Sequence, residues 1–411
     1  MTQTAYFNPP KPTIDTHALD QLPTRWVRTE DELYALIDEI DGIDKVALDT
    51  EFIKRTTYYP ILALVQVNTG SAIYLVDAPR LDLTEFWQAL AEIPTMIWYA
   101  CGEDLGIFYL LAKCPPLDNV FDVQLAVAYL SGKLQTGYSQ ALSEILGINI
   151  DKGESQSNWL ARPLSHEQEI YAANDVRYLL TLYEVVCDEL ARRNILSCTQ
   201  EDSRHYAHEL HELATQNDDV LYIDLLAPIY NRRQIAALQQ LTIWRETLAR
   251  ATNEPRSFII GKQALREIIE QMPDSIKLLA RTTLNRAVLR RHGDEIVRII
   301  RQTNALPENA LPPLPNPTYH SKAKPFKKPL DAALSEYSDT HHIPVNLLLK
   351  NRWLNHLLLL VAYDGDIDNL PRELLGYRKQ LVCEKLLPVL TPFKEHILQV
   401  LNTPQITNNN H

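Results

Sequence analysis

Two carboxylates one residue apart follow a short apolar run, and they are the first candidates for chemistry in this chain. Residues Lys45 to Leu48 predict a buried strand, with Asp49 and Glu51 at its end. Side chains alternate faces along a strand, so both carboxylates point to the same side, with backbones roughly 6–7 Å apart. A hard divalent cation, which takes carboxylate oxygens, would relieve the repulsion between them. An acidic loop leaving a strand has the same Asp-x-Glu pattern, and this alternative stays open.

A tyrosine and an aspartate continue the apolar face of a predicted helix. The capping-box pattern Ser165-His-Glu-Gln168 begins this helix, and its periodicity extends to about Arg193. Apolar residues recur at helical spacing as Leu179, Leu182, Val186 and Leu190. One and two turns earlier, the same face carries Asp175 and Tyr171.

Burial of an unpaired carboxylate is costly, so Asp175 needs a partner. A metal ion shared with the first two acids is one solution. The other is an ion pair with an arginine near the helix end, such as Arg177 or Arg162.

A fourth acid lies where a predicted strand, 96–99, leads into a helix that begins at Glu103. Asp104 lies beside the inward-facing positions of that helix. It is therefore a better candidate than Glu103 for a cleft at the strand ends, where open α/β sheets bind ligands. The helix dipole alone also favours acids in a first turn, which is the alternative explanation.

The elements that must position these residues begin as alternating strands and helices and continue as helices alone. Such alternation is typical of an α/β layer with a mixed sheet. Strands are predicted at 25–28, 45–48, 61–67, 72–76 and 96–99. Helices are predicted at 29–40, 83–91, 103–111, 123–130, 139–146 and 166–193, followed by helical segments at 232–301 and 330–401.

Charge is distributed unevenly along the 411 residues. The formal net charge of −12 argues, taken alone, against a nucleic-acid partner. Between Arg232 and Arg301, however, 14 basic and 7 acidic residues give a net charge of +7, which leaves −19 for the rest. Because charge acts locally, this one module is basic enough to contact a nucleic-acid backbone.

The cysteines and the apolar runs indicate where in the cell the protein is expected. Five cysteines, with no Cys-x-x-Cys pair among them, predict reduced thiols and a cytoplasmic protein. The longest apolar run, 357–363, is shorter than the roughly 20 residues that span a bilayer, so no membrane association is expected. No obligate protein partner is evident either.

Taken in order, Asp49, Glu51, Asp104, Tyr171 and Asp175 resemble the DEDD exonuclease superfamily in its tyrosine-bearing (DEDDy) branch. Further blocks resemble ribonuclease D, namely Tyr58-Tyr-Pro60, Leu64-Val-Gln66-Val, Ser157-Asn-Trp-Leu-Ala-Arg-Pro-Leu164 and Tyr171-Ala-Ala-Asn-Asp175-Val. The basic module, ending in Arg291-His-Gly-Asp-Glu-Ile296, is similar to an HRDC domain, and Glu373-Leu-Leu-Gly-Tyr-Arg-Lys379 to the end of a second one. The resemblance departs at Tyr99, where the family leads us to expect a histidine.

This resemblance implies a ribonuclease H-like mixed-sheet exonuclease domain followed by two all-helical HRDC-like domains. The expected parts are a flexible leader at 1–23, the exonuclease domain at 24–205, a first HRDC domain at 206–302, a Pro-rich linker at 303–320 and a second HRDC-like domain at 321–403.

The resemblance also implies 3′-to-5′ hydrolysis of RNA that releases nucleoside 5′-monophosphates with two divalent ions, Mg²⁺ or Mn²⁺. Asp49, Glu51, Asp104 and Asp175 would hold the ions, with Asp49 bridging both, and Tyr171 would orient the attacking water. A ligand set made only of oxygens independently favours these hard cations.

Three further residues are candidates for substrate contact. Thr50 and Phe52 are expected against the 3′-terminal nucleotide, where Phe52 either stacks on a base or serves only as core. Arg162 is expected either to bind a phosphate or to pair with a buried acid. The expected partner is RNA, above all transfer RNA precursors and other structured RNA with single-stranded 3′ tails.

Alternatives of different classes remain open. No residue of the motif distinguishes ribose from deoxyribose, so a 3′-to-5′ DNA exonuclease has the same signature. A nucleic-acid-binding scaffold with an inactive nuclease site and an interaction protein with a structural Ca²⁺ site are the others. Metal-dependent activity, as opposed to stabilisation alone, separates them from the enzyme.

Overall fold

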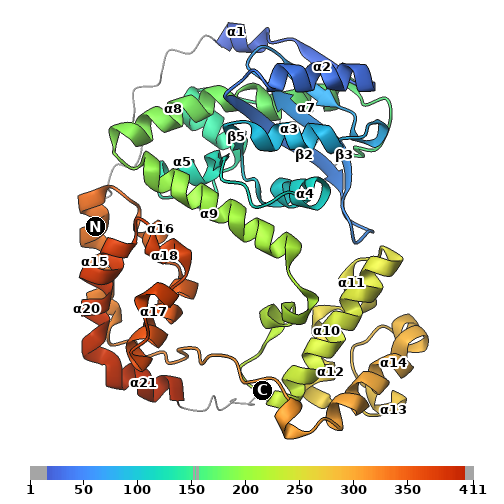
Figure 1. Cartoon of the computed structure of the whole chain (residues 1–411), viewed down its shortest axis with the longest axis vertical. Coiled ribbons are helices and arrows are strands. Elements are labelled where there is room, and N and C mark those ends of the chain that lie inside the picture. The colour runs from blue at the N-terminus through green and yellow to red at the C-terminus, as the bar shows by residue number, and fades with distance from the viewer. Residues whose placement is uncertain (1–15, 151–152, 154–156, 403–411) are drawn as a thin grey trace. The chain divides into compact units, whose positions relative to one another are not determined.

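The computed structural model describes residues 16–150, 153 and 157–402 and forms two compact units (Figure 1). The first unit contains the described residues through Ile53, then Leu62–Ala214 and Ala323–Ile397. The second contains Lys54–Ile61, Thr215–Lys322 and the described residues from Leu398 onward. The first unit is therefore built from stretches of chain on both sides of the second.

A six-stranded mixed sheet organises the first unit, which confirms the predicted α/β class. The strand order is β1-β4-β3-β2-β5-β6. The pairs β1–β4, β2–β5 and β5–β6 are parallel, and β3–β4 is antiparallel. The strands are β1 (Thr24–Val27), β2 (Lys45–Ile53), β3 (Ile61–Asn68), β4 (Ile73–Val76), β5 (Thr95–Trp98) and β6 (Val120–Asp122).

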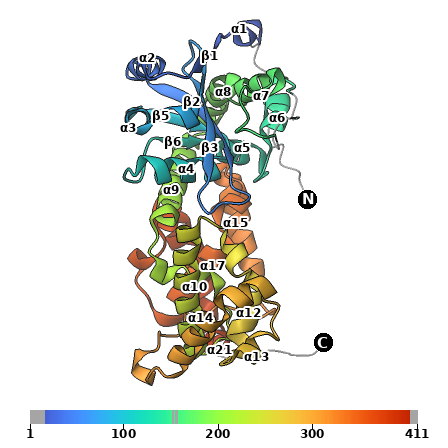
Figure 2. The ribbon, with the colours of Figure 1, turned by 90° about the vertical axis from the view of Figure 1, so that its right-hand side faces the viewer.

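Helices cover both faces of this sheet, as Figure 2 shows. The predicted capping boxes are present, with Thr29 and Glu32 beginning α2 and Ser165 and Gln168 beginning α7. The helices that precede the second unit are α1 (Thr16–Asp20), α2 (Glu30–Ile40), η1 (Ala78–Arg80), α3 (Thr84–Glu92), α4 (Gly102–Ala112), α5 (Val123–Ser131), α6 (Tyr138–Ala141), η2 (Leu142–Leu146), α7 (His166–Arg177), α8 (Leu179–Arg192) and α9 (Leu196–Thr215).

Two hydrophobic cores lie on the two faces of the sheet. Val46 and Leu48 of β2 belong to the core that α2, α3 and α4 cover. Ile73 and Leu75 of β4 belong to the other core, which α7 covers. Because side chains alternate along a strand, the burial of Leu48 on the α4 side turns its neighbour Asp49 toward α7.

The structure differs from the predictions in several elements, among them the helices α1 and α9, which were not predicted. Strand β2 continues through Ile53, so the two acids lie within the strand, whereas the apolar run that predicted it ends at Leu48. The short strand β6 was not predicted. The helix predicted at 166–193 is interrupted at Tyr178 and forms α7 and α8, although its apolar periodicity runs on without a break.

The second unit contains an all-helical module, as predicted, with its own core of residues such as Leu241, Ile268 and Ile300. Arg232 and Arg233 hold the chain that follows the module, donating to the backbone carbonyls of Leu311, Pro312, Thr303, Asn304 and Leu306. Its helices are η3 (Asp218–Val220), η4 (Ile223–Leu225), α10 (Arg232–Thr252), α11 (Arg256–Ile259), α12 (Lys262–Gln271), α13 (Ile276–Leu279), α14 (Arg286–Asn304) and η5 (Glu308–Ala310).

Helices at the C-terminal end return to the first unit, where they pack on α9. Arg378 is fully buried and forms a bidentate ion pair with Asp202 of α9, at 2.6 Å for each bond. A Cβ at Gly376 would overlap the carboxylate of Glu201, which accepts the backbone N–H of Tyr377 at 3.0 Å. These helices are α15 (Lys327–His341), α16 (Val345–Leu348), α17 (Asn351–Tyr363), η6 (Ile367–Asn369), α18 (Arg372–Leu375), α19 (Lys379–Leu381), η7 (Val382–Leu386), α20 (Leu387–Leu390) and η8 (Thr391–Phe393). Helix α21 (Lys394–Asn402) follows them, and its residues from Leu398 onward belong to the second unit.

The expected flexible leader falls partly outside the described residues, which begin at Thr16. From there the chain is held by α7, because Arg177 donates to the backbone carbonyls of Leu19, Asp20 and Leu22. In the part of the chain that the structure describes, no helix combines the length and the apolar character needed to cross a membrane.

Replacement of Asp202 by Ala should lower the free energy of unfolding by about 3–5 kcal/mol, because it leaves the buried Arg378 guanidinium without its counter-charge. Urea unfolding followed by circular dichroism measures this. The control is Glu184→Gln, which removes an ion pair with Lys45 in which the two side chains are 54% and 41% exposed. Its expected cost is at most about 1 kcal/mol, and equal costs for the two variants would contradict the structural role of the Arg378 pair.

Candidate active site

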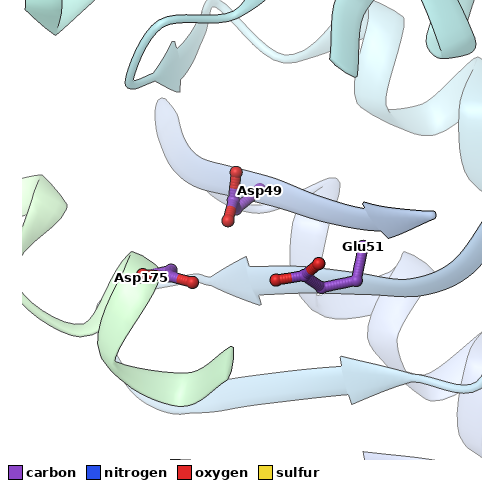
Figure 3. A group of neighbouring side chains, drawn as sticks. All are labelled: Asp49, Glu51 and Asp175. Carbon is purple, nitrogen blue, oxygen red and sulfur yellow. The ribbon is translucent and has the colours of Figure 1, made fainter. Parts of the chain in front are cut away.

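Three of the predicted acids converge in the first unit. Carboxylate oxygens of Asp49, Glu51 and Asp175 all lie within 4.8 Å of one another. Figure 3 shows the two side chains from β2 and the one from α7 turned toward the same small volume. Residues more than 120 positions apart in the sequence therefore form one group.

The sheet places this group at the carboxyl end of two parallel strands. The pairing of β2 with β5 stops at Ala47 and Ile97, so Asp49 and Glu51 lie beyond the last paired residue. Helix α7 packs against the same part of β2 and brings Asp175 to it. This is the edge at which open α/β sheets bind ligands.

Asp104 approaches the group from the other face of the sheet. It lies in the first turn of α4, and its carboxylate accepts a hydrogen bond from the hydroxyl of Thr50, the β2 residue between the two acids. Asp104 lies outside the 4.8 Å group, but it is close enough for its charge to shift the pKa values of Asp49 and Asp175. Glu103 beside it is exposed.

Burial and mutual repulsion perturb all four carboxyl groups. Burial raises the pKa of Glu51 to about 9, with Asp175 and Asp104 adding to the shift. Burial likewise raises the pKa of Asp175 to about 8 and that of Asp104 to about 6, where the Thr50 hydrogen bond opposes the rise. The pKa of Asp49 is raised well above its usual value by burial and then by the other three acids.

Tyr171 lies one helical turn before Asp175 and is half-buried. Its ring contacts the buried Trp159, with 5.9 Å between ring centroids. Burial and the charges of Asp175, Glu51 and Asp49 raise the pKa of its phenol. The hydroxyl therefore keeps its proton near neutral pH and is suited to donate a hydrogen bond.

The two arginines considered as partners for Asp175 are engaged elsewhere. Besides the carbonyls before β1, Arg177 binds the Thr24 hydroxyl and the Asn174 side chain. Arg162 pairs with the buried Asp77 at 2.7 Å and donates to the carbonyls of Ala63, Trp159 and Ala161. The guanidinium donors of Arg162 thus have protein acceptors, which is the buried ion pair expected as the alternative to phosphate binding.

The other two substrate-contact candidates occupy different environments. Thr50 is buried, and its hydroxyl is used by Asp104. Phe52 is partly exposed and lies outside both hydrophobic cores of the sheet. Its ring is therefore available for a contact beyond the protein core.

The sequence analysis missed the residues that hold the acids in place. Asp122, which begins α5, accepts the backbone N–H groups of Ala100 and Cys101 at 3.1 Å and so shapes the turn that leads to Asp104. Its signal was present, since an aspartate directly before a predicted helix is a favoured cap. Tyr138 and Asn68, which contact the backbone around the end of α7, have no such local signal.

The arrangement fits divalent cations. Four partly buried carboxyl groups lie close together, and no described arginine or lysine forms an ion pair with any of them. Such a group stays charged only if cations are shared among its oxygens, and Mg²⁺, Mn²⁺ and Ca²⁺ prefer oxygen ligands. Asp49, Glu51 and Asp175 are placed to share one cation, and Asp104 lies next to them.

Comparison with known proteins gives consistent matches over nearly the whole chain. Residues 24–191 match a family model described as a 3′-5′ exonuclease, and residues 234–300 match the HRDC domain. Ribonuclease D of Escherichia coli is 30% identical over 381 residues, which cover 90% of this chain and 99% of that protein. Ribonuclease D of a Shewanella species is 32% identical over 369 residues, covering 88% and 93%. The crystal structure of the Escherichia coli enzyme, described as an exoribonuclease involved in structured RNA processing, matches with a TM-score of 0.81 at 28% identity and covers 90% of this chain and 100% of its own.

Without metal, the protein should become less stable as the pH rises. The raised pKa values mean that the folded state keeps protons on these carboxyl groups that the unfolded chain releases near pH 4, so the folded state binds more protons between about pH 5 and pH 9. Melting temperatures measured in EDTA should fall over this range, and a divalent cation at pH 8 should restore stability.

Glu51→Gln removes one of these titrating groups and should flatten the fall in melting temperature. The matched control is Glu103→Gln, an exposed acid on the first turn of α4, which should leave the slope as in the wild type. A melting temperature in EDTA that is constant or rises with pH would contradict this account of the site.

Proposed function

The chain belongs to the ribonuclease D family, and on that premise we propose that it removes nucleotides from the 3′ end of RNA by a two-metal-ion mechanism. The observation that supports this proposal best is the convergence of the Asp49, Glu51 and Asp175 carboxylates, with Asp104 beside them. The products would be nucleoside 5′-monophosphates.

Asp49, Glu51, Asp104 and Asp175 would hold the ions, Mg²⁺ or Mn²⁺, with Asp49 shared between them. When bound, two such ions lower the pKa of a water molecule and neutralise charge on the attacking and leaving oxygens. Thr50 contributes by holding Asp104 through its hydroxyl.

Tyr171 would orient the attacking water through its protonated hydroxyl, one helical turn from Asp175. Burial of Tyr171 against Trp159 restricts the ring to few positions, so the hydroxyl is held in place before substrate arrives. Phe52, partly exposed near the acids, would stack on the terminal base.

The substrate we propose is structured RNA with a single-stranded 3′ tail, above all transfer RNA precursors. The support is the full-length similarity to the Escherichia coli exoribonuclease, which is described as acting in structured RNA processing. We place this activity in the cytoplasm, because the five cysteines are all free thiols.

The all-helical module in the second unit would be a first HRDC domain and would bind the RNA backbone. The C-terminal helices of the first unit would form a second HRDC-like domain. The module matches the HRDC family model, and its residues 232–301 carry a net charge of +7 within a chain whose net charge is −12. Its exposed basic residues around α13 and α14 include Lys277, Arg281, Arg286, Arg290 and Arg291. Backbone binding of this kind is electrostatic and independent of base sequence.

Digestion of a 5′-labelled RNA with a single-stranded 3′ tail tests the activity. With Mg²⁺ or Mn²⁺ the wild type should produce a ladder that shortens from the 3′ end, and EDTA should abolish it. Asp49→Asn should be inactive, whereas Tyr171→Phe should keep metal binding and lose on the order of 10²-fold in turnover, as expected for loss of one oriented hydrogen-bond donor.

A DNA oligonucleotide of the same sequence, digested in parallel, separates the two nuclease alternatives. RNA binding without a ladder under either metal would favour the scaffold alternative. Full activity of Asp49→Asn would overturn the site assignment.

Charge reversal on α14 tests the proposed backbone binding. In an Asp49→Asn background, the pair Arg286→Glu and Arg290→Glu should weaken RNA binding equally for unrelated sequences. The salt dependence of binding should fall by about one released ion for each phosphate that the variant no longer neutralises. Fluorescence anisotropy over a KCl series measures both quantities. The control is the pair Lys327→Glu and Lys328→Glu, which reverses the same number of charges at exposed positions of α15. The same weakening from this pair would refute a specific role for α14.

A further inference from the structure

The interruption between α7 and α8 lies directly after Asp175. Helix α7 ends at Arg177 and α8 begins at Leu179, with Tyr178 between them. In a continuous α-helix the backbone N–H of Tyr178 would donate to the carbonyl of Asn174. Here that N–H turns toward the carbonyl of Val176.

The hydroxyl of Tyr138, from the start of α6, lies in the place of the missing helical bond. It donates to the Asn174 carbonyl at 3.3 Å. Its oxygen also lies close enough to the backbone N–H of Tyr178 for that N–H to oppose the rise in the pKa of the Tyr138 phenol. A side chain inserted into the backbone ladder is an established cause of a helix break. This explains why an uninterrupted apolar periodicity folds as two helices.

The ring of Tyr138 is itself held by Tyr99. The two rings lie with centroids 5.0 Å apart, and the Tyr99 hydroxyl donates to the carbonyl of Thr136 at 2.6 Å. Tyr99 stands where the family resemblance led us to expect a histidine, so this chain uses the position to support the inserted tyrosine.

Asn68 holds the same interruption from the sheet. It is buried at the end of β3, and its amide donates to the carbonyls of Val176 at 2.9 Å and Arg177 at 3.2 Å. The last carbonyls of a helix lack partners within it, so Asn68 fixes the end of α7 to the sheet that carries Asp49 and Glu51.

We propose that Tyr138 and Asn68 are positioning residues that hold the interruption after Asp175 and thereby aim its carboxylate at Asp49 and Glu51. Loss of the Tyr138 hydroxyl frees the Asn174 carbonyl to accept the backbone N–H of Tyr178. The helix then continues through Tyr178 and the direction of α7 relative to β2 changes. This inference rests on the proposed function, because it takes Asp175 as a metal ligand.

Tyr138→Phe in the full chain tests the proposal, since it removes one hydroxyl and keeps the ring packed on Tyr99. Mn²⁺ affinity, measured by calorimetry without RNA, should fall by about 10-fold, as is typical when the support of a metal ligand is removed. The Mn²⁺ concentration for half-maximal cleavage should rise by the same factor, while KM for RNA stays unchanged and saturating Mn²⁺ restores turnover. Asn68→Ala should change Mn²⁺ affinity in the same direction.

Tyr74→Phe is the matched control, because it also removes a phenol hydroxyl at a buried position, one that donates to Glu39 at 2.5 Å. Its Mn²⁺ affinity should equal that of the wild type. Wild-type affinity in Tyr138→Phe would overturn the inference, and if Asn68→Ala does not fold, Tyr138→Phe alone decides. Asp175→Asn distinguishes failure of this inference from failure of the proposed function. If this variant binds Mn²⁺ as the wild type does, Asp175 is not a metal ligand and the proposed function itself fails.

Discussion

Repulsion among four partly buried carboxyl groups is the constraint on which the first unit depends. Asp49, Glu51 and Asp175 crowd one small volume and Asp104 adds its charge nearby, so the group persists only with protons or cations among its oxygens. Asp104 and the end of α7 after Asp175 are held by neighbouring residues. Thr50 binds Asp104, Asp122 shapes the turn before it, and Tyr138 and Asn68 hold the backbone after Asp175. The rigid sheet around these carboxyl groups holds them together and so offsets the unfavourable free energy of their repulsion.

Local patterns predicted the acids well, because strand alternation and helix capping act over a few residues. They placed Asp49 and Glu51 on one face and found both capping boxes. The assembly of five distant residues into one site came from the family resemblance and not from any local pattern. The interruption at Tyr178 could not be predicted from the sequence, because the polar atoms that cause it come from Tyr138 and Asn68, which are far away along the chain. These atoms bond to backbone groups, which every residue carries, so no residue type marks the position.

Residue type alone did not decide between function and structure. Arg162 was equally suited to a phosphate and to a buried acid, and the structure surrounds it with Asp77 and three backbone carbonyls. Thr50 was expected against substrate, yet its hydroxyl is turned to Asp104. In both cases the charged or polar partner is far away in the sequence, so tertiary contacts decide what the residue type leaves open.

The last stretch of the first unit, Ala323–Ile397, is separated from the rest of that unit by more than one hundred residues. Its helices are joined to α9 by side-chain contacts. The bidentate Arg378–Asp202 pair is buried, and Gly376 leaves room for no larger residue against Glu201. Covalent continuity is thus not what keeps these helices in place. A protease cut in the Pro-rich segment would leave the fragment that follows it attached to α9, and two separately expressed pieces divided there have the surfaces needed to reassemble.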